Sequence, residues 1–276
     1  MRIPASTPGQ SDRPGREPAA PSRAGSADCP ACAGTGFELV TAADGLGRAR
    51  RCVCSAASQT ARLLSAARVP RRYQGCQFEN FDELNDSLKL AKVRVRKFVD
   101  LYPINDFGLL LLGPCGRGKT HLATAALLAL VREKGVKGLF YDFRDLLKEI
   151  QASYNAVSGT TELAILQPVF AAEVLVLDDL GATKMTDWVR DTLSHIINNR
   201  YNDRRVTIFT SNLEDETTRA PLPDERVRER PTLRDRIGDS LRSRLYEMCE
   251  TVHVKSDKDF RVDVMKHSGR RPGLPT

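Results

Sequence analysis

The sequence contains no apolar run that is long enough to cross a membrane. A membrane-spanning helix needs about 18 or more consecutive apolar residues. The longest candidate, Leu122–Val131, is much shorter and contains Thr124. No apolar segment of the kind found in secretory signals stands near the N-terminus either. We therefore expect a cytoplasmic protein that is not integral to a membrane.

Residues 1–28 lack aromatic side chains and are rich in Pro, Gly, Ser and Arg. Such a segment cannot bury enough apolar surface to offset the entropy lost on ordering. A transit peptide would also be rich in Arg and Ser, but it would be poor in acids, whereas this segment contains Asp12, Glu17 and Asp28. We predict a disordered tail over 1–28 and a second, basic one over 262–276.

The seven cysteines are an odd number, which does not fit a framework of disulfides. Four of them, Cys29, Cys32, Cys52 and Cys54, follow a CxxC…CxC spacing. Four thiolates would close a tetrahedral Zn²⁺ site that has a structural role and no open position for catalysis. We predict a zinc-binding module over 29–60; free thiols, one disulfide or an iron–sulfur cluster are the alternatives.

The composition is that of a globular protein with a basic balance. Hydrophobic residues make up 41% and charged residues 28% of the chain. Lys and Arg number 42 against 35 Asp and Glu, so the formal net charge is +7. A basic protein suits a polyanionic partner, and nucleic acid is the first candidate.

Apolar runs alternate with helical patterns along most of the chain. An amphipathic helix is predicted over about 82–102, inside a linker region at 61–103. Beyond it, strands are predicted at 108–112, 136–143, 174–177, 206–210 and 251–254, and helices at 119–134, 144–154, 187–201 and 232–248. A charged, Pro-rich insertion interrupts the pattern at 215–231. Alternating strands and helices predict an α/β domain over 104–261, with a parallel sheet and helices on both faces.

Residues 113–120, with the sequence GPCGRGKT, match the phosphate-binding pattern G-x-x-x-x-G-K-[ST] between a strand and a helix. Glycines let successive backbone N–H groups point at phosphate oxygens, at a helix N-terminus that favours anions. Lys119 would reach the β- and γ-phosphates of ATP, and the Thr120 hydroxyl would bind Mg²⁺. The predicted ATP-binding residues are Gly113, Pro114, Cys115, Gly116, Arg117, Gly118, Lys119 and Thr120.

Two further strands end in polar residues. The run Val174–Leu177 is followed by Asp178 and Asp179, and the strand at 207–210 is followed by Ser211 and Asn212. The carboxyl ends of parallel strands form the edge at which open α/β folds bind ligands. Asp178 would hold the Mg²⁺ shell, Asp179 would polarise the attacking water, and Asn212 would orient it.

In this order and spacing, these elements resemble AAA+ ATPases, and more closely the DnaC-like helicase loaders and their IstB-like relatives. The resemblance covers residues 70–261. Its carriers are ENF at 79–81, GLLLLGPCGRGKTHLATA at 108–125, VLVLDDLGATKMTDW at 174–188, IINNRY at 196–201 and TIFTSN at 207–212. It implies an AAA+ P-loop core without a full C-terminal lid, Walker A at Lys119 and Thr120, Walker B at Asp178 and Asp179, and sensor 1 at Asn212.

The resemblance also implies residues that lie outside these motifs. Arg244 matches the arginine that loaders place in the ATP site of a neighbouring subunit, with Arg242 as the second choice. Arg261 matches the sensor 2 position. The segment that lines the DNA channel of loaders corresponds to 145–155, where Lys148 and Tyr154 could attract phosphates and stack on bases.

The resemblance implies an ATP-hydrolysing replication factor that uses ATP, Mg²⁺ and a structural Zn²⁺. Its partners would be a replicative helicase, single-stranded DNA and further copies of itself, joined through the ATP sites. One alternative is an IstB-like transposition helper that acts with a transposase on duplex DNA. Another is a nucleotide-switched interaction module with negligible hydrolysis.

Overall fold

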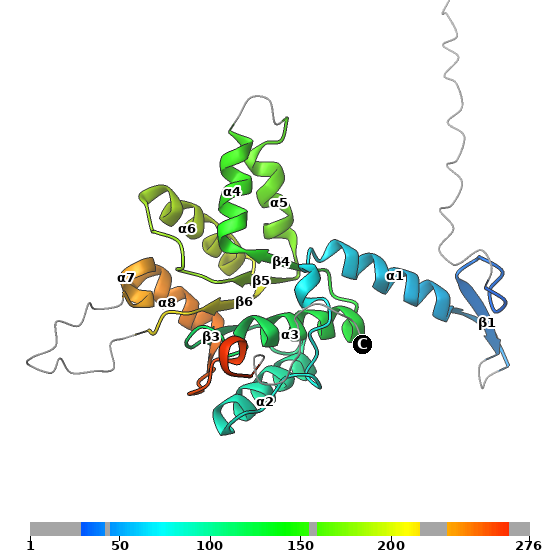
Figure 1. Ribbon diagram of the computed structural model, residues 1–276. Helices are drawn as coiled ribbons and strands as arrows, with labels where there is room; N and C mark the ends of the chain where they lie inside the picture. The colour runs from blue at the N-terminus through cyan, green and yellow to red at the C-terminus, as the bar shows by residue number, and fades with distance from the viewer. Residues whose placement is uncertain (1–28, 42–44, 155–158, 216–230, 265–276) are drawn as a thin grey trace, which may run out of the picture. The chain divides into compact units, whose positions relative to one another are not determined.

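The computed structural model describes residues 29–41, 45–154, 159–215 and 231–264 (Figure 1). They form two compact units, of which the first ends at Ser58 and the second begins at Gln59. The tail predicted at 1–28 and most of the predicted insertion lie outside the described residues. Residues 265–276, most of the predicted basic tail, lie outside them too.

The first unit contains a β-hairpin that the sequence patterns did not predict. Strands β1 (Phe37–Thr41) and β2 (Gly47–Arg51) pair antiparallel, with Phe37 opposite Arg51. All of β2 is exposed, so no alternation of apolar and polar residues marks it as a strand. The helix α1 (Val53–Ala66) follows directly, and it too was not predicted, since none of its residues is buried.

The second unit is built on a parallel sheet of five strands in the order β4-β5-β6-β3-β7. This confirms the predicted sheet. The strands are β3 (Gly108–Leu112), β4 (Gly138–Asp142), β5 (Val174–Asp178), β6 (Val206–Ser211) and β7 (Cys249–His253). Every residue of β3, β5 and β6 is buried, as expected for parallel strands that are covered on both faces.

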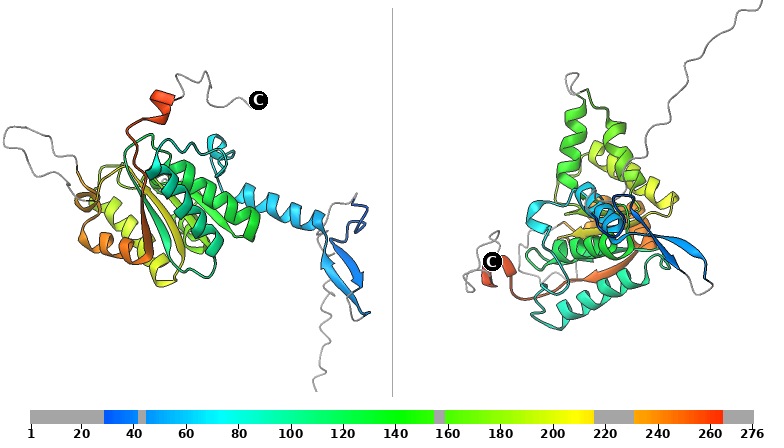
Figure 2. Two further views of the ribbon diagram at one scale, coloured as in Figure 1. Left: turned by 90° about the horizontal axis from the view of Figure 1, so that it is seen from below. Right: turned by 90° about the vertical axis from the view of Figure 1, so that its right-hand side faces the viewer.

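Helices cover both faces of this sheet (Figures 1 and 2). One hydrophobic core lies between the sheet and the helices α2 (Asp86–Leu101) and α3 (Lys119–Lys134). The other core lies under α4 (Phe143–Ser153), α5 (Glu162–Ala171), α6 (Asp187–Asn202), α7 (Leu233–Ile237) and α8 (Asp239–Met248). The helices predicted at 82–102, 119–134, 144–154 and 187–201 are all present.

Two helical predictions need correction. The helix α5 was missed because it contains Pro168 and is apolar on most sides, so it shows no helical periodicity. The single helix predicted over 232–248 is two helices, α7 and α8. They are separated by Gly238, whose φ of 80° and ψ of 164° lie outside the helical region and favour glycine.

The described chain has no helical lid after the sheet. Beyond β7 the described chain runs back along the phosphate loop, where the Phe260 N–H donates to the Gly116 carbonyl. Its last element is one helical turn, η2 (Phe260–Val264), which extends past residue 261, where we placed the end of the core. Among the described helices, none combines the length and the apolar character that a membrane crossing needs.

Candidate functional site

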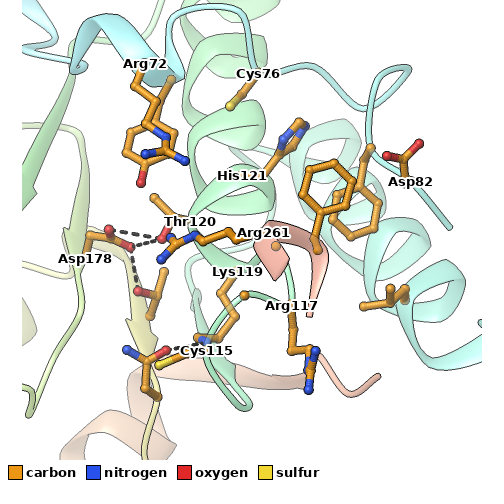
Figure 3. A pocket seen from close by; sticks show the side chains of 18 of the residues that line it. Arg72, Cys76, Asp82, Cys115, Arg117, Lys119, Thr120, His121, Asp178 and Arg261 are labelled. Carbon is orange, nitrogen blue, oxygen red and sulfur yellow. Dashed lines mark hydrogen bonds between the residues drawn. The ribbon is translucent and has the colours of Figure 1, made fainter. Parts of the chain in front are cut away.

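A cavity of about 700 Å³ opens beside the phosphate loop, next to residues at the carboxyl ends of the strands (Figure 3). It gathers residues that are far apart in the sequence. The predicted residues that line it are Cys115, Gly116, Arg117, Gly118, Lys119, Thr120, Asp178, Asp179, Asn212 and Arg261. Gly113 and Pro114 belong to the same loop but are not part of this lining.

The phosphate loop runs from the end of β3 to the first residue of α3. Gly113 and Gly116 have positive φ angles of 153° and 74°. A Cβ atom on Gly113 would overlap the Val254 carbonyl, and one on Gly116 would overlap the Asp259 carboxylate. These positions therefore require glycine, and the loop can present backbone N–H groups at the N-terminus of α3, where an anion is favoured.

Lys119 provides the positive charge at the bottom of this loop. Only 5% of the residue is exposed. Its Nζ donates hydrogen bonds to the Pro114 carbonyl at 2.7 Å and to Asn212 Oδ1 at 2.6 Å. Because both acceptors are neutral, burial dominates and lowers the pKa of Lys119 to about 8. A bound phosphate group would give this ammonium group the negatively charged partner that it does not have among its two hydrogen-bond acceptors.

Thr120 and Asp178 form a pair of oxygen ligands suited to Mg²⁺. The Thr120 hydroxyl lies 2.9 and 3.1 Å from the two carboxylate oxygens of Asp178. Asp178 also accepts a hydrogen bond of 2.6 Å from the Thr210 hydroxyl. Burial raises the pKa of Asp178, and a divalent cation would favour its charged form. Hydroxyl and carboxylate oxygens are the donors that Mg²⁺ prefers, so these residues fit the ion.

Asp179 and Asn212 meet beside this pair. Asp179 has a φ of 60°, in the left-handed region, and its N–H donates to the Thr210 hydroxyl at 2.9 Å. Its Oδ1 accepts a hydrogen bond from Asn212 Nδ2. Since Asn212 also accepts from Lys119, this one amide connects the phosphate-binding cation to the carboxylate predicted to polarise water.

Sequence patterns missed the aromatic wall of the cavity. This wall contains Tyr73, Cys76, Phe81 and His121. The Phe81 ring lies so close to the loop that a Cβ atom on Gly118 would stand 2.6 Å from it, and its centroid is 5.5 Å from that of His121. An aromatic and apolar wall of this kind is suited to a nucleobase. The only signal for it was the ENF segment at 79–81, which contains Phe81.

The three arginines implied by the resemblance occupy different places. Arg261 reaches from η2 into the cavity, beside Lys119 and Thr120 (Figure 3). Arg242 and Arg244 lie on α8, and neither is part of the cavity lining. Arg242 Nε donates to Asp215 at 2.7 Å, and Arg244 donates to Asn198 on α6. Of these three arginines, therefore, only Arg261 faces the nucleotide site of its own chain.

The two residues implied as DNA contacts lie on or next to α4, outside the cavity. Lys148 Nζ is 3.0 Å from Asp145. Tyr154 is 55% exposed, donates to Glu162 at 2.9 Å and accepts from Trp188 Nε1 at 3.2 Å. The structure thus fixes the Tyr154 ring against α5 and α6, at the far end of α4 from the nucleotide site.

The four cysteines of the first unit form a single cluster. All four sulfur atoms lie within 4.8 Å of one another. Cys29 and Cys52 are separated by 3.7 Å, and Cys32 and Cys54 by 3.4 Å. A disulfide would need about 2.05 Å, whereas thiolates around one tetrahedral Zn²⁺ stand roughly 3.8 Å apart, given Zn–S bonds of about 2.3 Å. The cluster therefore fits a structural zinc ion, and it is not a pair of disulfides.

Hydrogen bonds also favour the thiolate form of one member of the cluster, Cys32. The Gly36 N–H points at the Cys32 sulfur from 3.4 Å. Burial alone would raise the pKa of Cys32, but the bonds from Gly36 and from neighbouring groups lower it to about 7. Backbone N–H groups directed at sulfur are a normal outer shell of such metal sites.

We expect Cys32→Ser to lose the metal. The purified full-length chain should contain about one Zn²⁺, since four thiolates complete its coordination, and the variant should contain much less. Metal content by elemental analysis measures this, and Cys115→Ser, a matched change outside the cluster, should keep the full amount. Nucleotide binding should survive in Cys32→Ser. A chain that is free of metal and yet keeps a folded first unit would contradict the zinc assignment.

Comparison with known proteins gives a consistent result. The model of a protein family described as IstB-like ATP binding protein matches residues 48–264, which is more than half of the chain. Among individual proteins, YqaM of Bacillus subtilis strain 168 is 25% identical over 222 residues, covering 76% of this chain and 64% of YqaM.

Two further relatives are helicase loaders by name. The replicative helicase loader DnaC of Escherichia coli K12 is 28% identical over 171 residues, covering 61% of this chain and 66% of DnaC. A solved structure, the crystal structure of the DnaC helicase loader, superposes with a TM-score of 0.54 at 35% identity. That match covers 67% of this chain and 100% of the other. The chain thus spans just under two thirds of the length of YqaM and of E. coli DnaC.

Proposed function

The chain belongs to the family of IstB-like ATP-binding proteins, within the DnaC-like AAA+ ATPases, and from this premise we propose that it hydrolyses ATP to load a replicative helicase onto single-stranded DNA. The observation that carries the ATPase part is the convergence of Lys119, Thr120, Asp178, Asp179 and Asn212 beside one cavity. These residues come from three separate segments of the sequence, and each bonds to another member of the group.

The chemistry follows from where these groups lie. The backbone of the phosphate loop and Lys119 would hold the β- and γ-phosphates of ATP, with Arg261 as a further cation. Thr120 and Asp178 would hold Mg²⁺, which when bound neutralises charge on the phosphate oxygens. Asp179 would accept a hydrogen bond from the attacking water. Asn212, which bonds to both side chains, would hold the Asp179 carboxylate in a fixed position relative to Lys119.

The helicase and DNA parts of the proposal rest on the relatives and on α4. The E. coli relative is named as a replicative helicase loader. On this chain, Lys148 and Tyr154 offer a cation and an exposed ring, the groups that bind the phosphates and bases of a single strand. The position of Arg244 on α8, outside its own cavity, supports assembly of several copies through their ATP sites.

We expect a replicative helicase to co-purify with the full-length protein from its native cells when ATP is present. Lys119→Ala, which removes the cation of the phosphate loop, should retain less helicase because its AAA+ domain cannot bind ATP. Mass spectrometry of the captured proteins identifies the partner. Capture of a transposase in place of a helicase would favour the alternative of a transposition helper. Equal capture by both forms would contradict an ATP-dependent role.

A further inference from the structure

The positive charge of the chain is concentrated in one stretch of sequence. Residues 45–78 contain seven Arg and no Lys, Asp or Glu. The formal net charge of the whole chain is also +7, so the residues outside this stretch are neutral in sum. Attraction of the chain to a polyanion therefore depends on these seven side chains.

Three of the seven arginines stand together on one strand of the first unit. They are Arg48, Arg50 and Arg51 of β2, and every residue of this strand is exposed. The described residues of the first unit contain a single acid, Glu38. The hairpin of β1 and β2 is thus a basic surface that the nucleotide site of the second unit does not use.

One face of the hairpin carries a pair of guanidinium groups. Alternate residues of a strand point to the same side and stand about 6.8 Å apart, given a rise of about 3.4 Å per residue, so Arg48 and Arg50 share a face. Arg50 Nη2 lies 3.1 Å from the Glu38 carboxylate, and the Arg50 side chain is still 66% exposed. An exposed ion pair of this kind contributes little to stability. A phosphate, which a guanidinium group binds through two parallel hydrogen bonds, can take the place of that carboxylate.

The other face of the hairpin carries an aromatic ring beside a cation. Phe37 lies directly opposite Arg51 in the register of the two strands, and opposite residues of an antiparallel pair share a face. Phe37 is 48% exposed. A ring on which a base can stack, next to a group that attracts phosphate, is typical of sites for single-stranded nucleic acid. The bases of a duplex are stacked on one another, so this face fits a single strand.

The cysteine cluster holds the two ends of the hairpin together. Cys32 precedes β1, Cys52 follows β2 directly, and the Cys52 N–H donates to the Gly36 carbonyl at 2.9 Å. A two-stranded hairpin alone is marginally stable at best, and β2 buries none of its residues. The position of the basic side chains therefore depends on the cluster.

We propose that the hairpin of β1 and β2 is a second binding site for single-stranded DNA. Arg48 and Arg50 bind phosphates of a strand that wraps around the hairpin, and Phe37 stacks on one of its bases beside Arg51. This inference goes beyond the proposed function, because binding at the hairpin requires neither ATP nor a helicase and involves no residue of α4.

The test measures binding of the full-length protein, without nucleotide, to a fluorescein-labelled thymidine oligonucleotide by fluorescence anisotropy over a range of KCl concentrations. The variant in which Arg48, Arg50 and Arg51 are all changed to Gln should bind about tenfold to a hundredfold more weakly at about 0.1 M KCl. The slope of log affinity against log salt should become shallower by about 2, since each phosphate contact to a single strand contributes about 0.7.

Two further variants separate this site from a general effect of charge. Phe37→Ala should weaken binding about fivefold or more, the contribution of one stacked base, and should leave the salt slope unchanged. Changing Arg132, Lys134 and Arg190 to Gln removes the same charge from exposed positions on α3 and α6 and should leave binding close to that of the parent. Zinc content near that of the parent shows that each variant keeps a folded hairpin.

Each other outcome overturns the proposal. If the triple variant of the hairpin retains zinc and binds the oligonucleotide with the affinity and salt slope of the parent, the hairpin is not a DNA site. If the control variant loses as much affinity, only net charge matters. If the hairpin variant keeps DNA and loses a captured protein partner, the surface is a protein interface. ATP hydrolysis without DNA should be the same in the parent and the hairpin variant, so the two proposals fail separately.

Discussion

Arg244→Ala should bind ATP nearly as well as the parent protein and hydrolyse it roughly 10³–10⁵-fold more slowly, which is the contribution of an arginine that stabilises phosphoryl transfer from a neighbouring subunit. The reason lies in where the side chain stands. Arg244 is on α8 and bonds to Asn198, and it does not line the cavity of its own chain. Its removal therefore leaves the phosphate loop, Thr120 and Asp178 intact.

Mixing two inactive variants tests whether the arginine acts between chains. Lys119→Ala cannot hold the phosphates of ATP but still carries Arg244. Arg244→Ala has an intact cavity and lacks the arginine. In a mixed assembly, the intact cavity of an Arg244→Ala subunit can receive the arginine of a neighbouring Lys119→Ala subunit. Hydrolysis should therefore partly return. Phosphate release by the mixture, compared with each variant alone, is the measurement.

Arg242→Ala is the matched control for this experiment. It removes an arginine two positions away, whose side chain is held by Asp215, and it should keep most of the hydrolysis. If Arg242→Ala loses hydrolysis and Arg244→Ala does not, the acting residue is Arg242. If mixing restores nothing although the two variants assemble together, the model of a shared site is wrong.

Asp179→Asn should keep ATP binding and lose hydrolysis by roughly 10²–10⁴-fold, the usual contribution of a group that accepts a proton or hydrogen bond from the nucleophile. Asparagine has the same shape and tolerates the left-handed backbone found at this position, where φ is 60°. The substitution therefore removes the negative charge with little strain. Calorimetric titration with ATP and a turnover assay on the same sample separate the two effects.

Lys119→Ala provides the contrast, because it should lose ATP binding itself. Lys119 supplies the cation of the phosphate loop, whereas Asp179 is connected to Lys119 only through the Asn212 amide. Hydrolysis by Asp179→Asn at the parent rate would show that another group polarises the water. Loss of binding in Asp179→Asn would show that the two residues do not have separate roles.

Several features of this protein could be predicted from short stretches of sequence. The phosphate loop could be predicted because its residues, 113–120, are contiguous and follow directly after an apolar strand. The same holds for β5, where an unbroken apolar run ends at Asp178. The cysteine spacing predicted that Cys29, Cys32, Cys52 and Cys54 form one cluster, because a metal site imposes its ligand number and type on the chain.

Tertiary structure alone decided the features that depend on contacts between distant segments. The helix α5 carries no periodic pattern, because it is apolar on most sides, and only its packing in the second core shows it to be a helix. The partners of Asp179 are Arg144, which lies 35 residues before it in the chain, and Asn212, which lies 33 residues after it. They meet Asp179 only because β4, β5 and β6 are neighbours in the sheet. Phe81 likewise reaches Gly118 only through folding. Local chemistry specifies a phosphate loop, whereas the packing of the sheet determines which residues can act on the water beside it.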